Sequence, residues 1–263
     1  MGLEIKNKSG QVTIFIIIAI LIVAAVLIFL FVLNSKTPST TEKPSENAGS
    51  FLDSCLKETL KESIEVIGNH GGTADPLFGK KFVFEDVGAT ELMYLCYTQN
   101  YYEQCSNQQP MLISHVKEEI GDYIEDEINY CWSELGKSFE KEGYVVEAQR
   151  IRGYEVELGY NDVKVVIDGV ISLTKSGETT REEKFTATLP SKFYEVTRVA
   201  QEITSQEATY CSFNHLGYML TYPEFKIIRT LTSDSVKIYD VEHRETGEKF
   251  RFAIRGCVIP PGP

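Results

Sequence analysis

The chain has 263 residues, 43% of them hydrophobic and 24% charged, which is typical of a globular protein and excludes collagen-like, low-complexity and coiled-coil chains. Twenty-six basic residues against 38 acidic residues give a net charge of -12. Because a surface of that sign repels phosphate backbones, we expect no nucleic-acid partner.

One long apolar run lies near the N-terminus. Residues 12–33 read VTIFIIIAILIVAAVLIFLFVL, in which only Thr13 is polar. A helix of this length spans roughly 33 Å, enough to cross a hydrocarbon core of about 30 Å. The run exceeds the apolar part of a cleavable secretory signal, and the polar residues Asn34 and Ser35 follow it instead of a small-residue cleavage site. We therefore expect a single-pass anchor in the lipid bilayer over residues 12–33, with residues 1–11 in the cytoplasm.

The cysteines indicate the orientation of this anchor. The flanking positive charges are nearly balanced, with Lys6 and Lys8 before the run and Lys36 and Lys43 after it. An even number of cysteines confined to one side favours an oxidising exterior, whereas a cytoplasmic domain with buried thiols is the alternative. We expect a protein of the cell membrane whose large domain is extracytoplasmic. All six cysteines follow the run: Cys55, Cys96, Cys105, Cys131, Cys211 and Cys257.

The residues that lead into the apolar run resemble a known type of signal. Residues 8–15 read KSGQVTIF, which resembles the class III, prepilin-like signal of archaeal surface proteins. The resemblance implies cleavage by a peptidase between Gly10 and Gln11 and a helix that serves as the stem of a filament. Pilin stems usually carry Glu at the fifth mature position, where this chain has Phe15.

A second resemblance extends further along the chain. Residues 54–59, the glycines at 71–72 and residues 250–255 look like uncharacterised single-pass proteins of small-genome archaea. This resemblance implies a lineage and a membrane topology. It implies no activity.

The remainder of the chain reads as a linker followed by one domain. Residues 34–50 are rich in Ser, Thr and Pro, which is typical of a flexible tether, and residues 51–263 form the expected extracytoplasmic domain. Apolar side chains recur at three- and four-residue spacing over 51–67, 111–131 and 192–210. This spacing predicts three amphipathic helices.

Other segments alternate apolar and polar residues, which predicts strands. Turn residues join several of them, so hairpins with interspersed helices are expected. The sequence therefore predicts an α+β domain with an antiparallel sheet and about three helices. The expected strands cover 81–85, 92–97, 154–158, 163–173, 183–189, 225–231, 236–241 and 250–254.

The cysteine positions favour one set of disulfides among the fifteen connectivities that six cysteines allow. Two cysteines fall on apolar faces of predicted helices that could pack together, two bracket an eight-residue loop, and two remain. The preferred pairs are Cys55–Cys131, Cys96–Cys105 and Cys211–Cys257. Buried free thiols are the alternative. Zinc is disfavoured because the chain has no Cys-x-x-Cys pair, and we expect neither a metal nor a cofactor.

No catalytic residues emerge from the sequence. It contains no HExxH, GxSxG, P-loop or GxGxxG motif. The Ser54-x-x-Lys57 spacing of serine acylases recurs at three other places, so it carries no weight. The acidic run over 118–127 suggests a calcium site or a cationic partner, but a solvated helix face explains it better.

One loop stands out as a candidate contact surface. Tyr97, Tyr101 and Tyr102 lie among several Asn and Gln side chains, and aromatic faces beside amides suit contacts with sugars or proteins. We therefore expect a membrane-anchored cell-surface protein with a structural, adhesive or binding role, with envelope components or other surface proteins as partners. A pilin-like subunit cleaved at Gly10/Gln11 is the alternative, and an extracytoplasmic enzyme of unknown class is a third hypothesis.

Overall fold

The computed structural model describes residues 22–23, 47–148 and 150–260. The chain divides into residues 1–45 and residues 46–263, and every element named below belongs to the second unit.

Two predictions from the sequence concern residues outside the described part of the chain. Apart from Ile22 and Val23, the expected anchor over 12–33 lies outside the described residues, as do Gly10 and Gln11. Among the residues that are described, none of the helices combines the length and the apolar content needed to cross a membrane.

The second unit has an α+β fold, as the sequence predicts. Its described part contains four helices instead of three, because the short helix after residue 214 has too few turns to show a period. The helices are α2 (Ala48–Asn69), α3 (Leu112–Lys141), α4 (Phe193–Tyr210) and α5 (His215–Thr221).

The first sheet has the strand order β1-β2-β10-β9-β8, with β3 paired to β2. The expectation of purely antiparallel pairing is wrong for β2 and β10, which run parallel with Ala253 opposite Tyr94. Because several helices and the whole second sheet separate these two strands in the sequence, no local turn fixes their relative direction. The strands are β1 (Gly79–Phe84), β2 (Gly88–Tyr97), β3 (Ser106–Asn107), β8 (Phe225–Leu231), β9 (Lys237–His243) and β10 (Lys249–Arg255).

The second sheet is antiparallel and is built around one long strand. It contains β4 (Val145–Ala148), β5 (Gly153–Leu158), β6 (Asp162–Lys175) and β7 (Glu178–Pro190). The strand β7 pairs along almost the whole of β6. The strands β5 and β4 pair with successive parts of β6, so they share its other edge end to end.

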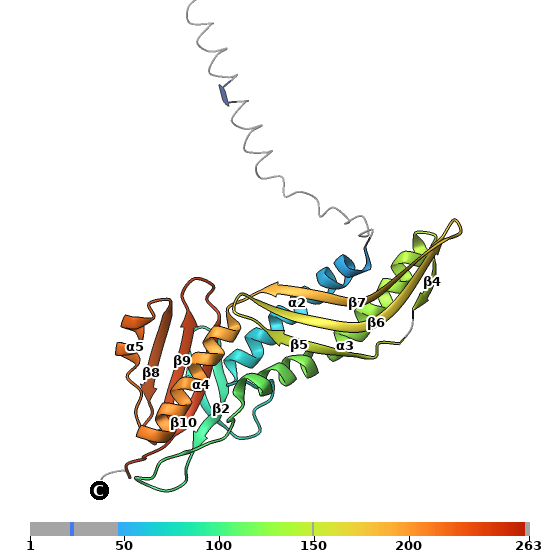
Figure 1. Ribbon diagram of the computed structural model, residues 1–263. Coiled ribbons are helices and arrows are strands. Elements are labelled where there is room, and N and C mark those ends of the chain that lie inside the picture. The colour runs from blue at the N-terminus through green and yellow to red at the C-terminus, as the bar shows by residue number, and fades with distance from the viewer. Residues whose placement is uncertain (1–21, 24–46, 149, 261–263) are drawn as a thin grey trace, which may run out of the picture. The chain divides into compact units, whose positions relative to one another are not determined.

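Helix α2 connects the two sheets (Figure 1). It packs against β7 of the second sheet, β10 of the first sheet and the neighbouring helix α3. The side chain of Asn47 caps its first turn by accepting a hydrogen bond of 2.7 Å from Gly49 N. Its apolar stripe lies in the main core and consists of Leu52, Leu56, Leu60, Ile64 and Ile67.

The C-terminal end of α2 lies close to β2 and β10. Met93 N donates a hydrogen bond of 3.0 Å to the carbonyl of His70. At Gly71, φ is +84° and an added Cβ would lie 3.0 Å from the Cβ of Met93, so this position requires glycine. Gly71 lies where the chain turns tightly after the end of α2, beside β2 and β10.

The helix and strand boundaries differ from the predicted ones at several points. Helix α2 begins at Ala48, within the segment expected as linker, and α3 continues ten residues past 131 because Leu135 and Phe139 extend its buried stripe. The strand β4 and the two-residue strand β3 were not predicted.

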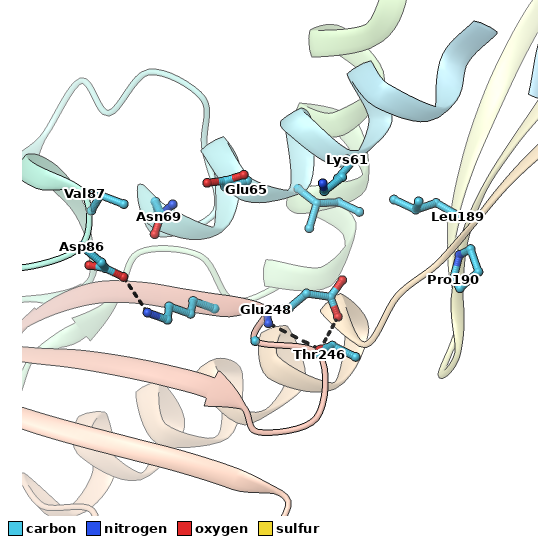
Figure 2. Close-up of a pocket in the computed structure, with 12 residues that line it drawn as sticks. Lys61, Glu65, Asn69, Asp86, Val87, Leu189, Pro190, Thr246 and Glu248 are labelled. Carbon is cyan, nitrogen blue, oxygen red and sulfur yellow. Dashed lines mark hydrogen bonds and ion pairs between the residues drawn. The ribbon is translucent and has the colours of Figure 1, made fainter. Parts of the chain in front are cut away.

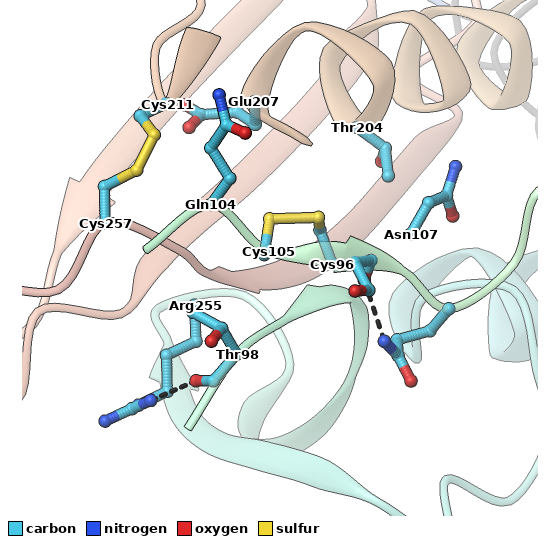
Figure 3. Close-up of a disulfide and its surroundings, with 12 residues drawn as sticks. Cys96, Thr98, Gln104, Cys105, Asn107, Thr204, Glu207, Cys211, Arg255 and Cys257 are labelled. Carbon is cyan, nitrogen blue, oxygen red and sulfur yellow. Dashed lines mark hydrogen bonds between the residues drawn. A yellow bond between two sulfur atoms is a disulfide. The ribbon is translucent and has the colours of Figure 1, made fainter. Parts of the chain in front are cut away.

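The structure contains three disulfides, and they are the pairs that the sequence favours. Their Cα atoms are 6.0, 5.4 and 5.9 Å apart for Cys55–Cys131, Cys96–Cys105 and Cys211–Cys257 respectively. The first pair connects α2 to α3, and the other two lie near each other beside the C-terminal end of α4 (Figure 3).

Candidate functional site

The predicted contact loop, residues 97–104, is held at both ends. The Cys96–Cys105 disulfide closes it (Figure 3), and Gln104 Nε2 donates a hydrogen bond of 2.7 Å to the Thr209 carbonyl at the end of α4. Cys257 N donates to the carbonyl of Glu103 at 2.6 Å, which attaches the loop to the C-terminal segment. The loop is therefore fixed to two separate elements of the fold.

Two of the three predicted contact tyrosines lie at the surface. The side chains of Tyr101 and Tyr102 are 50% and 69% exposed. Their backbone is held in place, because Tyr101 forms a parallel bridge with Val258 and Tyr102 N donates a hydrogen bond of 2.9 Å to the Val258 carbonyl. The structure thus presents two aromatic rings on an ordered backbone.

Tyr97 has a different role. Its ring packs edge-on against Phe78 at a centroid distance of 4.7 Å and against Tyr94 at 5.1 Å, and the guanidinium of Arg255 lies 5.6 Å from its centroid. Burial raises the pKa of the neighbouring Tyr94 to about 12. Tyr97 therefore supports the base of the loop from within an aromatic cluster.

A buried polar network that was not predicted from the sequence lies below the loop. The carboxylate of Glu207 is fully buried and accepts hydrogen bonds from the Tyr239 hydroxyl, at 2.5 Å, and from Lys237 Nζ. Lys237 also donates to the carbonyl of Cys211 at 2.6 Å. Burial and the Glu207 carboxylate raise the pKa of Tyr239. The signal was available, since Glu207 continues the apolar spacing of Ala200 along α4.

A cleft of about 490 Å³ lies between α2, the β1–β2 turn, the β9–β10 turn and the end of β7 (Figure 2). Ile64, Val87, Leu189 and Pro190 form its apolar lining. Charged groups of both signs line the rest.

Two of the acidic groups at this cleft have structural partners. Lys249 and Arg251 each lie 2.6 Å from Asp86, and together they hold the pKa of that carboxyl well below its ordinary range. Glu248 accepts hydrogen bonds from Ser191 Oγ at 2.5 Å and from Lys192 N at 2.6 Å, which caps the first turn of α4. The cleft can make polar contacts with a ligand, but these two carboxylates are already committed to the fold.

The acidic run of α3 is largely solvated, as the sequence suggests. Within it, Glu119 accepts hydrogen bonds from Thr73 Oγ1 at 2.9 Å and from Ala74 N at 2.8 Å, so it anchors the loop after α2. Glu127 lies beside the Cys55 and Cys131 sulfurs. Among the described residues, these three form the one cluster whose ligand atoms are close enough together to hold a metal ion. Because those sulfurs are bonded to each other, they are not thiolate ligands.

No protein-family model matches the chain, and no curated protein and no solved structure match it. The stapled loop and the cleft therefore have to be interpreted from their own chemistry.

Proposed function

We propose that the protein is a membrane-anchored cell-surface protein whose extracytoplasmic domain makes structural or adhesive contacts through the stapled loop. The observation that carries this proposal is the pair of exposed rings, Tyr101 and Tyr102, on a backbone held by disulfides. A rigid tyrosine supplies a large contact area at a low entropic cost.

The position of the loop in the domain supports the same role. The domain begins at Ala48, at one end of α2, and the loop lies beyond the other end (Figure 1). The 22 residues of α2 alone span about 33 Å. The loop therefore lies about one helix length or more from the N-terminal end of α2.

The membrane anchor rests on the apolar run of residues 12–33, and the exterior location rests on the cysteines. All six cysteines follow the run, and all six are paired. Such pairing is typical of domains that fold in an oxidising compartment.

Binding of the full chain to cell-envelope material tests the contact role. We expect the double substitution Tyr101→Ala and Tyr102→Ala to abolish binding, while Tyr130→Ala, which removes an exposed tyrosine from α3, leaves it unchanged. Equal binding by both variants contradicts the proposal.

The second candidate is a pilin-like subunit, which the KSGQVTIF sequence at residues 8–15 favours. The intact mass or the N-terminal sequence of the purified protein separates the two functions. A chain that begins at Gln11 supports the pilin-like subunit, and a chain that keeps residues 1–10 rules it out.

A further inference from the structure

The strand β8 has a partly free edge on the first sheet: Phe225 N bonds to the Tyr222 carbonyl, and the free part lies at Arg229 and Leu231. It pairs with β9 on one side, and the sheet ends with β8. Ile227 N donates to Met219 Sδ of α5 at 3.1 Å, so the main-chain groups of Ile227 face away from β9. Because these groups alternate along an antiparallel strand, those of Arg229 and Leu231 also face outward. In the described part of the chain no group bonds to them.

The surroundings of this edge are apolar and basic. Ile228 and Leu231 are 47% and 66% exposed, and Leu220 of the adjacent helix α5 is 87% exposed. Lys226 has a carboxylate partner in Glu242, whereas Arg229 lies beside the Tyr239 side chain and has no carboxylate partner within the described residues. On a protein with a net charge of -12, this is an unusual surface.

The strand β5 has a complementary free edge on the second sheet. Among the described strands it pairs only with β6, and the Gly159 N to Asp162 carbonyl hydrogen bond closes their hairpin. This register places the main-chain groups of Tyr154, Val156 and Leu158 on the side away from β6.

An acidic groove runs beside the β5 edge. A space of about 490 Å³ lies between β5 and α3, and its lining includes Glu118, Asp122 and Glu155. All three are exposed. Lys117 is the cation of the lining and lies 3.9 Å from Glu155, an exposed pair that contributes little. The groove is suited to an extended segment with apolar and basic side chains.

We propose that the β8 edge of one copy adds as a strand to the β5 edge of a second copy. In an antiparallel register with Arg229 opposite Val156, both side chains lie on the face that α3 covers, where Glu118 and Asp122 are available to the guanidinium. Lys226 then lies on the same face as Glu155 and Glu157. Main-chain hydrogen bonds supply affinity, and the charges supply register and selectivity.

Two competing pairings fit less well. Pairing β8 with β8 of another copy would bring two basic edges together. The other edge strand of the first sheet, β1, is also basic, but Lys80 already lies 2.6 Å from Asp234. Because the two paired edges differ, the contact is heterologous and generates an open chain of copies unless its rotation closes a ring.

Sedimentation velocity of the full chain in detergent, with reciprocal charge reversals, tests the pairing. We expect the wild type to self-associate and the β8 variant, K226E/R229E, to associate at least about tenfold more weakly. The β5-groove variant, E118K/E155K, should behave in the same way. An equimolar mixture of the two variants should associate again, because the acidic β8 edge of one variant faces the basic β5 groove of the other.

Recovery on mixing separates lost pairing from misfolding. The control K81E on β1 and the double variant Y101A/Y102A should associate like the wild type. The test of self-association is therefore independent of the proposed role of the contact loop. Monomeric wild type at every accessible concentration overturns the proposal, as does a mixture that remains dissociated. Full association of E118K/E155K on its own also overturns it and indicates pairing through β8 alone.

Discussion

Arg251 Nη2 lies 2.6 Å from Asp86 Oδ2, and this contact fixes the β1–β2 turn to the centre of the first sheet. The Arg251 side chain is almost fully buried, with 2% of its surface exposed. It also donates hydrogen bonds of 3.1 Å to Asp240 and 3.0 Å to Asn69, and its guanidinium lies 4.2 Å from the centroid of the Phe84 ring. One side chain thus connects β10, β9, the β1–β2 turn and the end of α2.

Replacement of Arg251 by Met should lower the free energy of unfolding by about 3–5 kcal/mol, because it leaves Asp240 buried without its cation. Urea denaturation of the purified protein measures this loss. Lys249→Met removes a more exposed cation from Asp86 and should cost less than about 1 kcal/mol. Equal losses for the two variants would show that the burial of Arg251 makes no extra contribution to the free energy of unfolding.

Acidification should destabilise the protein through Asp86. Hydrogen bonds from Arg251 and Lys249 lower the pKa of Asp86 from its ordinary value of 3.8. The native state therefore binds fewer protons than the unfolded chain as the pH falls through that value, so stability decreases with falling pH. In urea titrations across this range, Asp86→Asn should flatten the decrease.

Asp240 provides a control of opposite sign. Burial raises its pKa, so protonation of the native state partly offsets the acid loss. Asp240→Asn should therefore make the decrease in stability steeper. Identical pH dependence in both variants and in the wild type contradicts the assignment of acid sensitivity to this cluster.

The sequence predicts elements whose pattern is local. The long apolar stripe of α3 and the alternation in β6 identify those elements, and the positions of Cys55 and Cys131 on two apolar helix faces point to their pairing. The parallel contact between Ala253 and Tyr94 has no local signal, because it depends on which strand, distant in the sequence, pairs with β2.

The candidate sites, too, were predictable from the sequence only where their pattern is local. Tyrosine and amide residues identified the loop that carries Tyr101 and Tyr102, but the packing of Tyr97 depends on Phe78, which is distant in the sequence. Alternation along β10 places Phe250 and Phe252 on one face of the sheet and Arg251 on the other face. It does not reveal that Phe84 covers that face of the sheet.

Close packing at the bulge in β6 leads to a third prediction. The register with β7 shifts between Ile167 and Val170, and there Gly169 contacts the ring of Trp132. A Cβ at Gly169 would lie 2.6 Å from Trp132 Cη2, so Gly169→Ala should cost about 1–3 kcal/mol in the free energy of unfolding. Gly153→Ala adds its methyl group to open space and should have no destabilising effect. Thermal denaturation compares the two, and an equally stable Gly169→Ala variant would show that Trp132 moves without cost.

The disulfides should contribute to stability in the order of the loops that they close. Cys55 and Cys131 are 76 residues apart and Cys96 and Cys105 are 9 apart, so the entropy model assigns about 4.5 and about 2.6 kcal/mol to the two bonds. Paired Cys→Ala variants, unfolded in urea under oxidising conditions, measure each contribution with the remaining bonds intact. We expect loss of the α2–α3 bond to cost about 2 kcal/mol more than loss of the loop bond. The reverse order would mean that the Cys96–Cys105 bond acts mainly on the native state, by holding the backbone below Tyr101 and Tyr102, and that variant should then also lose binding to envelope material.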